Sequence, residues 1–202
     1  MNMKHIVLVS LTTMALAAHG QVTVNFDNTV PSGNFTAWSN PYIESGYSFT
    51  AQNTGNIDFL NSAVFGLESY NNTDYVNSQG DVITIVKQAG GAFAFDSVAI
   101  GENNTTGRTI SILGYLGVTQ VASLSYTTTP GGAFSGPASW SLVNLPSGFS
   151  DVDKVTLSLG TMSYSAGFDN FTFSPAPVPE PSSLALAALA GAGLLYFRRR
   201  RA

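Results

Sequence analysis

The stretch KVTLSL, residues 154–159, carries the periodicity that decides the fold. Val155, Leu157 and Leu159 are apolar and alternate with two hydroxyl residues, so in an extended backbone the three apolar side chains point to one side. A half-buried β-strand has this pattern, whereas an amphipathic helix repeats every 3.6 residues. The stretch therefore predicts a strand with one face in a core.

The same alternation recurs throughout residues 21–174, where helical periodicity is weak. It is clear at 22–26 and 110–112, and further strands are expected at Tyr47–Ala51, Val82–Val86, Ala92–Ile100, Val118–Tyr126, Ser139–Val143 and Gly167–Phe173. Turn clusters rich in Pro, Gly and Asn separate them, at 31–34, 103–107, 129–132 and 146–148. Around nine or ten short strands punctuated in this way predict an all-β antiparallel β-sandwich, a jelly roll. A β-solenoid is the alternative, although no fixed repeat emerges.

Charge is scarce and unevenly distributed. Charged residues make up 10% of the 202 residues, against about 25% in a typical soluble domain. Residues 21–178 hold three basic residues, Lys87, Arg108 and Lys154, and eleven acidic ones, a formal net charge of −8. Nucleic-acid binding needs clustered Lys and Arg to neutralise phosphates, so this balance argues against a nucleic-acid partner.

The residue types needed for several kinds of catalysis are missing. The chain contains no cysteine, which excludes disulfides, thiolate metal sites and cysteine nucleophiles. Both histidines, His5 and His19, lie within the first 20 residues. If that segment is removed, Ser-His-Asp catalysis and imidazole zinc sites are excluded as well. We therefore expect no catalytic residue and a protein that is not an enzyme.

Residues 1–20, MNMKHIVLVSLTTMALAAHG, have the parts of a secretory signal peptide. Lys4 precedes an apolar stretch, and small residues follow before cleavage after Gly20 or Ala17. A buried N-terminal helix is the alternative. The segment predicts export through the secretion machinery.

The other end of the chain, residues 175–202, combines four features. They are a proline-rich spacer, the tetrapeptide Val178, Pro179, Glu180 and Pro181, the apolar run from Leu184 to Phe197, and the basic residues Arg198, Arg199, Arg200 and Arg201. As a helix the apolar run would span about 21 Å, shorter than the bilayer core of about 30 Å, but snorkelling arginines and bilayer thinning compensate. The run predicts a single transmembrane helix, and the arginines predict a cytoplasmic stop. A terminal core helix with a solvated basic tail is the alternative.

In order and spacing, Pro179-Glu180-Pro181, the apolar run and the arginines resemble the PEP-CTERM sorting signal. The resemblance implies export in a Gram-negative bacterium, transient anchoring in the inner membrane, and recognition and cleavage near the motif by an exosortase. It also implies a final place at the cell surface or in the extracellular matrix, in association with biofilm and exopolysaccharide. The two prolines suit recognition because they hold the backbone extended and delay the start of the helix.

A short pattern recurs three times between the ends, as NFDN at 25–28, AFDS at 94–97 and GFDN at 167–170. The outer copies lie in the expected first and last strands, and the body resembles galactose-binding-like jelly rolls of exported proteins. Carbohydrate-binding jelly rolls often carry structural calcium near those strands, which makes Asp27 and Asp169, each with the asparagine that follows it, candidate ligands. The alternative is that each Asp-Asn pair satisfies a turn or bulge. Otherwise we expect no cofactor.

Sugar binding requires exposed aromatic faces flanked by polar groups. The candidates for sugar stacking are Trp38, in the loop-like NFTAWSNPY, and Tyr70 and Tyr75, in SYNNTDY. Trp140 shares parity with Leu142 and is expected in the core.

A glycosidase would require two carboxylates roughly 5 to 10 Å apart. Asp151 and Asp153 are close in sequence, but SDVDKV before a strand is typical of a solvated turn. The sequence thus predicts a signal peptide at 1–20, a β-sandwich at 21–174 and a sorting signal at 175–202. The leading function is an exported, non-enzymatic protein of the cell surface or matrix. A carbohydrate-binding module for exopolysaccharide is the alternative, and a cryptic hydrolase is the third hypothesis.

Overall fold

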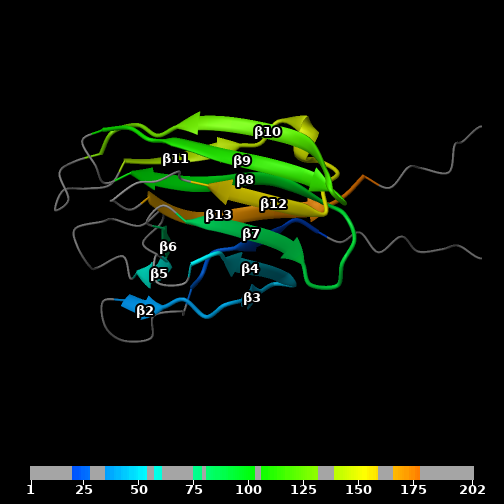
Figure 1. Ribbon diagram of the computed structural model, residues 1–202, viewed down its shortest axis with the longest axis horizontal. Coiled ribbons are helices and arrows are strands. Elements are labelled where there is room, and N and C mark those ends of the chain that lie inside the picture. Colours follow the sequence, from blue (N-terminus) through cyan, green and yellow to red (C-terminus); the bar gives the residue numbers. More distant parts are fainter. Residues whose placement is uncertain are drawn as a thin grey trace, which may run out of the picture.

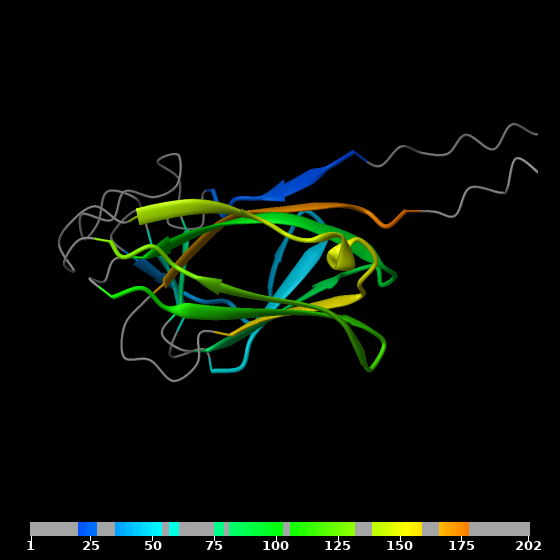
Figure 2. The same cartoon turned by 90° about the horizontal axis from the view of Figure 1, so that it is seen from above.

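Two antiparallel sheets face each other in the computed structural model, which describes residues 20–27, 35–53, 57–60, 75–78, 81–102, 106–131, 139–158 and 166–177. The described residues form thirteen strands and one 3-10 helix (Figures 1 and 2). The prediction of an all-β antiparallel sandwich is confirmed.

The first sheet has seven strands in the order β11-β8-β13-β6-β5-β2, with β1 pairing β13 beside this path. These strands are β1 (Val22–Val24), β2 (Phe35–Ala37), β5 (Ile57–Leu60), β6 (Tyr75–Ser78), β8 (Phe93–Glu102), β11 (Ser139–Asn144) and β13 (Ala166–Pro175). The second sheet has six strands in the order β10-β9-β12-β7-β4-β3. They are β3 (Tyr42–Glu44), β4 (Tyr47–Ala51), β7 (Val82–Lys87), β9 (Thr109–Leu116), β10 (Thr119–Thr127) and β12 (Lys154–Ser158), and helix η3 is Ser147–Phe149.

Residues 154–158 form the central strand β12, as their alternation predicts, and Leu159 lies outside the described residues. Val155 and Leu157 are buried, and the hydroxyl residues between and after them are only partly buried. The sequence did not reveal the short strands β2, β3, β5 and β6, which have three or four residues each. A run that short shows at most two periods of alternation, too few to stand out from a loop.

Strand β13 pairs with three neighbours and contains a bulge. It pairs with β8 along one edge, and its other edge is shared by β6, opposite residues 166–168, and β1, opposite residues 171–173. Between these two partners the register shifts and Asn170 adopts a left-handed φ of 47°. The bulge lets Phe168 and Phe171 both face the core although they are three residues apart.

The core is built largely from aromatic rings. Eight phenylalanines are less than 2% exposed: Phe26, Phe49, Phe93, Phe95, Phe149, Phe168, Phe171 and Phe173. Phe26 packs edge-on against Phe49 and Phe171, with ring centroids 5.6 and 5.7 Å apart. Burying each such side chain stabilises the fold by about 1.5–3 kcal/mol relative to exposing it. This core compensates for the scarcity of charge and the absence of disulfides.

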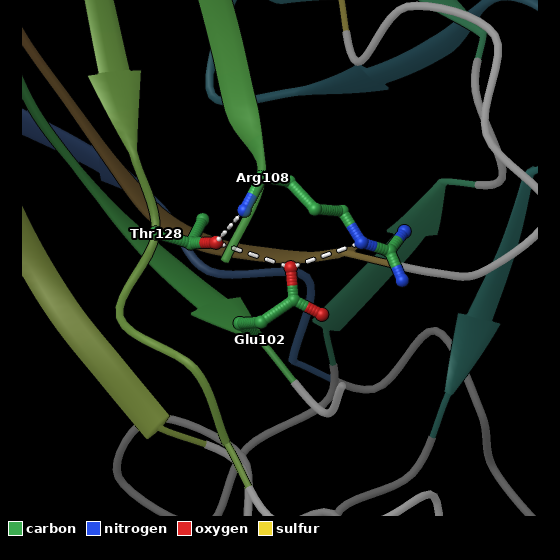
Figure 3. A network of polar contacts seen from close by, with 3 residues as sticks. All are labelled: Glu102, Arg108 and Thr128. Carbon is green, nitrogen blue, oxygen red and sulfur yellow. Dashed lines mark hydrogen bonds and ion pairs between the residues drawn. The ribbon is translucent and has the colours of Figure 1, made fainter. Parts of the chain in front are cut away.

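A buried polar network ties the two sheets together at one end (Figure 3). The Nε of Arg108 lies 3.1 Å from Oε2 of Glu102, and Oγ1 of Thr128 donates a hydrogen bond to the same oxygen at 3.1 Å. The backbone N–H of Arg108 donates to Thr128 Oγ1 at 2.7 Å. The Arg108 and Glu102 side chains are 2% and 0% exposed. Because Glu102 ends β8 and Arg108 precedes β9, this network links the first sheet to the second.

Two parts of the sequence prediction fall on residues that the structure does not describe. They are the signal peptide before Gly20 and the stretch from Val178 onward, with its sorting motif and apolar run. Within the described ranges, no helix is long and apolar enough to cross a membrane.

The network predicts that replacing Thr128 destabilises the protein far more than replacing the adjacent Thr127. Thr128→Val should lower the free energy of unfolding by about 1–3 kcal/mol, because it leaves buried partners without the hydroxyl. Thr127→Val is the matched control, since its exposed hydroxyl contacts only Thr109 among the described residues, and should change stability by less than about 0.5 kcal/mol. Urea denaturation measures both values. Equal effects of the two substitutions would contradict this role for the network.

Candidate functional site

The chain enters and leaves the sandwich at the same end. Gly20 and Pro175 both line a cleft of about 230 Å³, together with Tyr47 of β4 and Lys87 of β7. Figure 2 shows β1 beginning and β13 ending on this side. We call this the exit end of the sandwich. Any segment that continues beyond residue 177 starts here.

Asp96 fixes the two chain ends relative to each other. Its Oδ2 accepts a hydrogen bond from Ser174 Oγ at 2.5 Å and one from Gln21 Nε2 at 3.3 Å. Its backbone carbonyl accepts from the N–H of Leu145 at 2.8 Å. Burial raises the pKa of the Tyr47 phenol, and the charge of Asp96 raises it further. In the middle copy of the recurring pattern, the aspartate therefore has a structural role at the exit end.

The outer copies of the pattern lie on neighbouring strands, since Val24 of β1 pairs with Phe171 of β13. Asp27 is exposed and accepts a hydrogen bond from Asn25 Nδ2 at 2.5 Å. Asp169 is fully buried, and its Oδ1 accepts from the N–H of Asn170 at 2.6 Å. These contacts are those of a turn and a bulge.

Calcium binding by Asp27 and Asp169 stays a prediction. Among the described residues, no group of three or more His, Cys, Asp or Glu side chains is placed to hold a metal ion. Asn28 lies outside those residues, so part of the expected ligand set is not described. Asn170 occupies the bulge with a left-handed backbone.

The acidic pair Asp151 and Asp153 forms the solvated turn that the sequence suggests. Asp151 is exposed. Asp153 Oδ2 accepts a hydrogen bond from the N–H of Gly117 at 2.6 Å, and its backbone N–H donates to the Tyr115 carbonyl at 2.8 Å. These contacts hold the turn between β9 and β10.

Trp38 lies in the core, and the expectation of an exposed face at this residue is corrected. It is 6% exposed, and its ring stacks on Phe59 with centroids 4.9 Å apart and planes at 20°. Tyr42 flanks it at 5.8 Å. The segment between β2 and β3 turns the indole inward, although its sequence is typical of a surface loop. Tyr70 lies outside the described residues, and Tyr75 begins β6.

Trp140 is on the surface side of the first sheet, so its predicted core position is wrong. Val143 on the same strand points into the core, whereas Leu142 is 48% exposed. Trp140 shares the outward parity of Leu142. Its side chain is partly exposed and lies over Gly101, the residue opposite it on β8. A Cβ at Gly101 would come within 2.6 Å of the indole ring.

Two glycines lie beside Trp140 in the first sheet. The cross-strand row runs from Trp140 through Gly101 of β8 and Gly167 of β13 to Asn77 of β6. Gly101 and Gly167 carry no side chains, and the indole packs directly on the backbone at Gly101. Both glycines are buried. Parity alone could not find this site, because it shows which residues share a face and not which face is buried. The glycines at 101 and 167 are visible in the sequence, but only the cross-strand register places them beside Trp140.

The chain has two tryptophans, and the structure predicts opposite fluorescence behaviour for them. Trp38→Phe leaves Trp140, whose emission should lie at longer wavelength and be quenched more steeply by acrylamide. Trp140→Phe leaves the buried Trp38, with shorter-wavelength emission and weak quenching. The Trp38 Nε1 has no hydrogen-bond acceptor in the described part of the chain, so Trp38→Phe removes no hydrogen bond there. Both variants should behave alike in concentrated urea, and a reversed order in the folded state would contradict these placements.

The model of the PEP-CTERM protein-sorting motif matches residues 177–201. The resemblance stated from the sequence is thereby confirmed, and the motif implies export across the membrane and processing by an exosortase. The match begins two residues after the end of β13. No curated protein matches the sequence.

Several solved structures are similar to the described domain. A DUF4465 family protein from Bacteroides caccae has a TM-score of 0.50 at 9% identity, with 77% of this chain and 99% of that chain covered. The K2 cleaved adhesin domain of Lys-gingipain has a TM-score of 0.48 at 13% identity, with 76% and 97% covered. A family 29 carbohydrate-binding module from Piromyces equi has 0.39 at 7% identity, with 70% and 89% covered. The first likeness shows a shared fold, and a shared fold assigns no ligand.

Proposed function

We propose that this chain is an exported, non-enzymatic protein that an exosortase sorts through Pro179-Glu180-Pro181, and that it acts at the cell surface or in the extracellular matrix. The observation that carries the proposal is the sorting motif matched at 177–201, directly after the last strand. An enzyme that reads the motif needs an accessible, extended segment. Pro175 is exposed at the exit end, where the chain leaves the folded domain, and this position favours access to the residues that follow.

Four finer elements belong to the same proposal. Residues 1–20 act as a signal peptide, the run from Leu184 to Phe197 spans the inner membrane as a helix, and Arg198–Arg201 stay in the cytoplasm. The sandwich is a jelly roll. Both ends of the domain leave from one side, which suits a domain that is translocated first and then held from its C-terminal end.

The non-enzymatic part of the proposal rests on composition. Nucleophilic triads and imidazole metal sites require histidine, and the chain has none after His19. The sandwich domain would therefore act by binding through its surfaces, as a structural or adhesive component of a matrix.

The mass of the protein recovered from cells tests the sorting proposal. We expect loss of the chain beyond the neighbourhood of Pro181, so that residues 182–202 are absent from the recovered form. Replacing Pro179, Glu180 and Pro181 with alanine should leave the full tail in place. Pro175→Ala, outside the motif, is the control and should be processed normally. An intact wild-type mass that retains residues 182–202 would contradict processing.

Carbohydrate binding is the second candidate function, and the placement of Trp140 favours it. The indole packs on Gly101 and is partly exposed, and an exposed aromatic face packs against the C–H face of a pyranose ring. The acidic net charge of residues 21–178 favours a neutral or basic polysaccharide over an acidic one. The proposed site differs from the one expected at Trp38, which is buried.

A glycan array probed with the recovered protein, followed by titration of any glycan that binds, tests this second function. Trp140→Ala should reduce the affinity for that glycan at least tenfold, a loss of about 1.4 kcal/mol. Asn144→Ala is the control, because Asn144 is exposed on the same face of β11 and lies away from Gly101 in the register. Binding that is unchanged in Trp140→Ala would rule out this site.

A further inference from the structure

The turn between β9 and β10 exposes a cluster of apolar side chains. Val118 is 98% exposed, and Leu116 and Val121 are each 45% exposed. These are three of the five large hydrophobic residues that stand out as exposed in the described structure, and they lie within six residues of sequence. We call Leu116, Val118 and Val121 the apolar tip.

The fold does not require these side chains. Gly117, the first residue of the two-residue turn, has a φ of 61°, which is the conformation that type II′ hairpins assign to glycine. Its N–H donates to Asp153 Oδ2 at 2.6 Å, which fixes the turn from outside. The second position accepts almost any residue, and exposed turns usually carry polar ones. A valine that is 98% exposed contributes almost nothing to the core.

The apolar tip lies at the exit end. Tyr115, beside the tip, pairs with Lys154 of β12, and Lys154 pairs with Val86 of β7. The next residue of β7, Lys87, pairs with Tyr47 of β4. Tyr47 in turn stacks on Phe173 of β13 at 4.0 Å. Figures 1 and 2 show the β9–β10 turn on the same side as the end of β13.

The length of the chain beyond β13 limits how far this end can be from a membrane. Eight residues lie between Pro175 and Leu184, and the nine steps from Pro175 to Leu184 span at most about 32 Å when fully extended. A bilayer that holds the run from Leu184 to Phe197 therefore keeps the exit end within this distance of its surface.

Other residues near the tip also suit a membrane surface. Both lysines among the described residues, Lys87 and Lys154, lie at the exit end. The Lys154 ammonium group sits 4.4 Å from the centre of the Tyr115 ring. Apolar side chains next to a tyrosine and lysines make the composition of a membrane interface, where ammonium groups reach the phosphates and apolar groups enter the acyl boundary.

We propose that the apolar tip inserts into the outer leaflet of the bilayer that holds the C-terminal segment, and so orients the domain on the membrane. This inference rests on the proposed function, because it requires the apolar run to be in that bilayer. Three side chains bind a membrane weakly alone, but the tail raises their local concentration at its surface. Cleavage of the tail removes this advantage, so the processed domain is released.

Because the chain has no cysteine, a single introduced cysteine can be labelled at one chosen position to test this inference. Val118→Cys is introduced into the chain that retains residues 175–202 and is labelled with an environment-sensitive fluorophore. The labelled protein is reconstituted into vesicles of phosphatidylethanolamine and phosphatidylglycerol. Thr129→Cys is the matched control, because Thr129 is exposed and follows the far end of β10. We expect blue-shifted emission and quenching by brominated lipid for the label at 118, and neither for the label at 129.

Flotation of the vesicles separates this inference from the proposed function. If the protein floats but the labels at 118 and 129 have the same emission and the same quenching, insertion of the apolar tip is overturned and the anchored tail is not. Protein that does not float overturns both. A blue shift at 118 that occurs without vesicles and grows with protein concentration identifies a second copy of the chain as the partner, and also overturns membrane insertion.

Discussion

The sandwich depends on the packing of β13 between its neighbours. Phe171 and Phe173 on this strand are fully buried, and their rings contact Phe26, Phe49 and Phe95. The strand pairs on both edges, with β8 on one side and with β6 and β1 on the other. The bulge at Asp169–Asn170 allows β13 to pair with both β6 and β1 along the same edge. It also allows the phenylalanines on both sides of the bulge to point into the core. The last strand is therefore the least replaceable part of the fold.

This constraint has a mechanical consequence for a chain carrying a C-terminal sorting motif. Any pull on the segment after Pro175 acts along β13. This strand cannot slide without breaking its hydrogen bonds to β8 and β1 and withdrawing the buried rings of Phe168, Phe171 and Phe173. The Asp96 carboxylate accepts a hydrogen bond from Ser174, near the end of β13, and another from Gln21 at the start of the domain. It therefore links the last strand to the first described residues. These contacts therefore stabilise the exit end at the point where a force on an anchored tail would act.

The sequence predicted the sandwich and the sorting motif well, for different physical reasons. Alternation of apolar and polar residues reports strands directly, and the long strands β8, β9, β10 and β13 were all visible. The motif at 177–201 is linear, so it can be recognised without knowledge of any fold. The surface around Trp140 was missed because it depends on cross-strand register with Gly101 and Gly167, which no local pattern contains. Trp38 was misplaced for the related reason that loop-like composition does not reveal which way a loop folds.

The two ends of the sandwich differ in chemistry, and this difference defines how the domain would be oriented on a membrane. The apolar tip, both described lysines and the start of the tail share the exit end, whereas Glu102, Arg108 and Thr128 close the opposite end with a buried network. Trp140 is opposite Gly101, one residue from the end of the ten-residue β8. At about 3.3 Å per residue, the indole lies roughly 25 Å along the sheet from Phe93. A domain held by its exit end would therefore present the tryptophan surface away from the membrane, where an extracellular polymer could reach it.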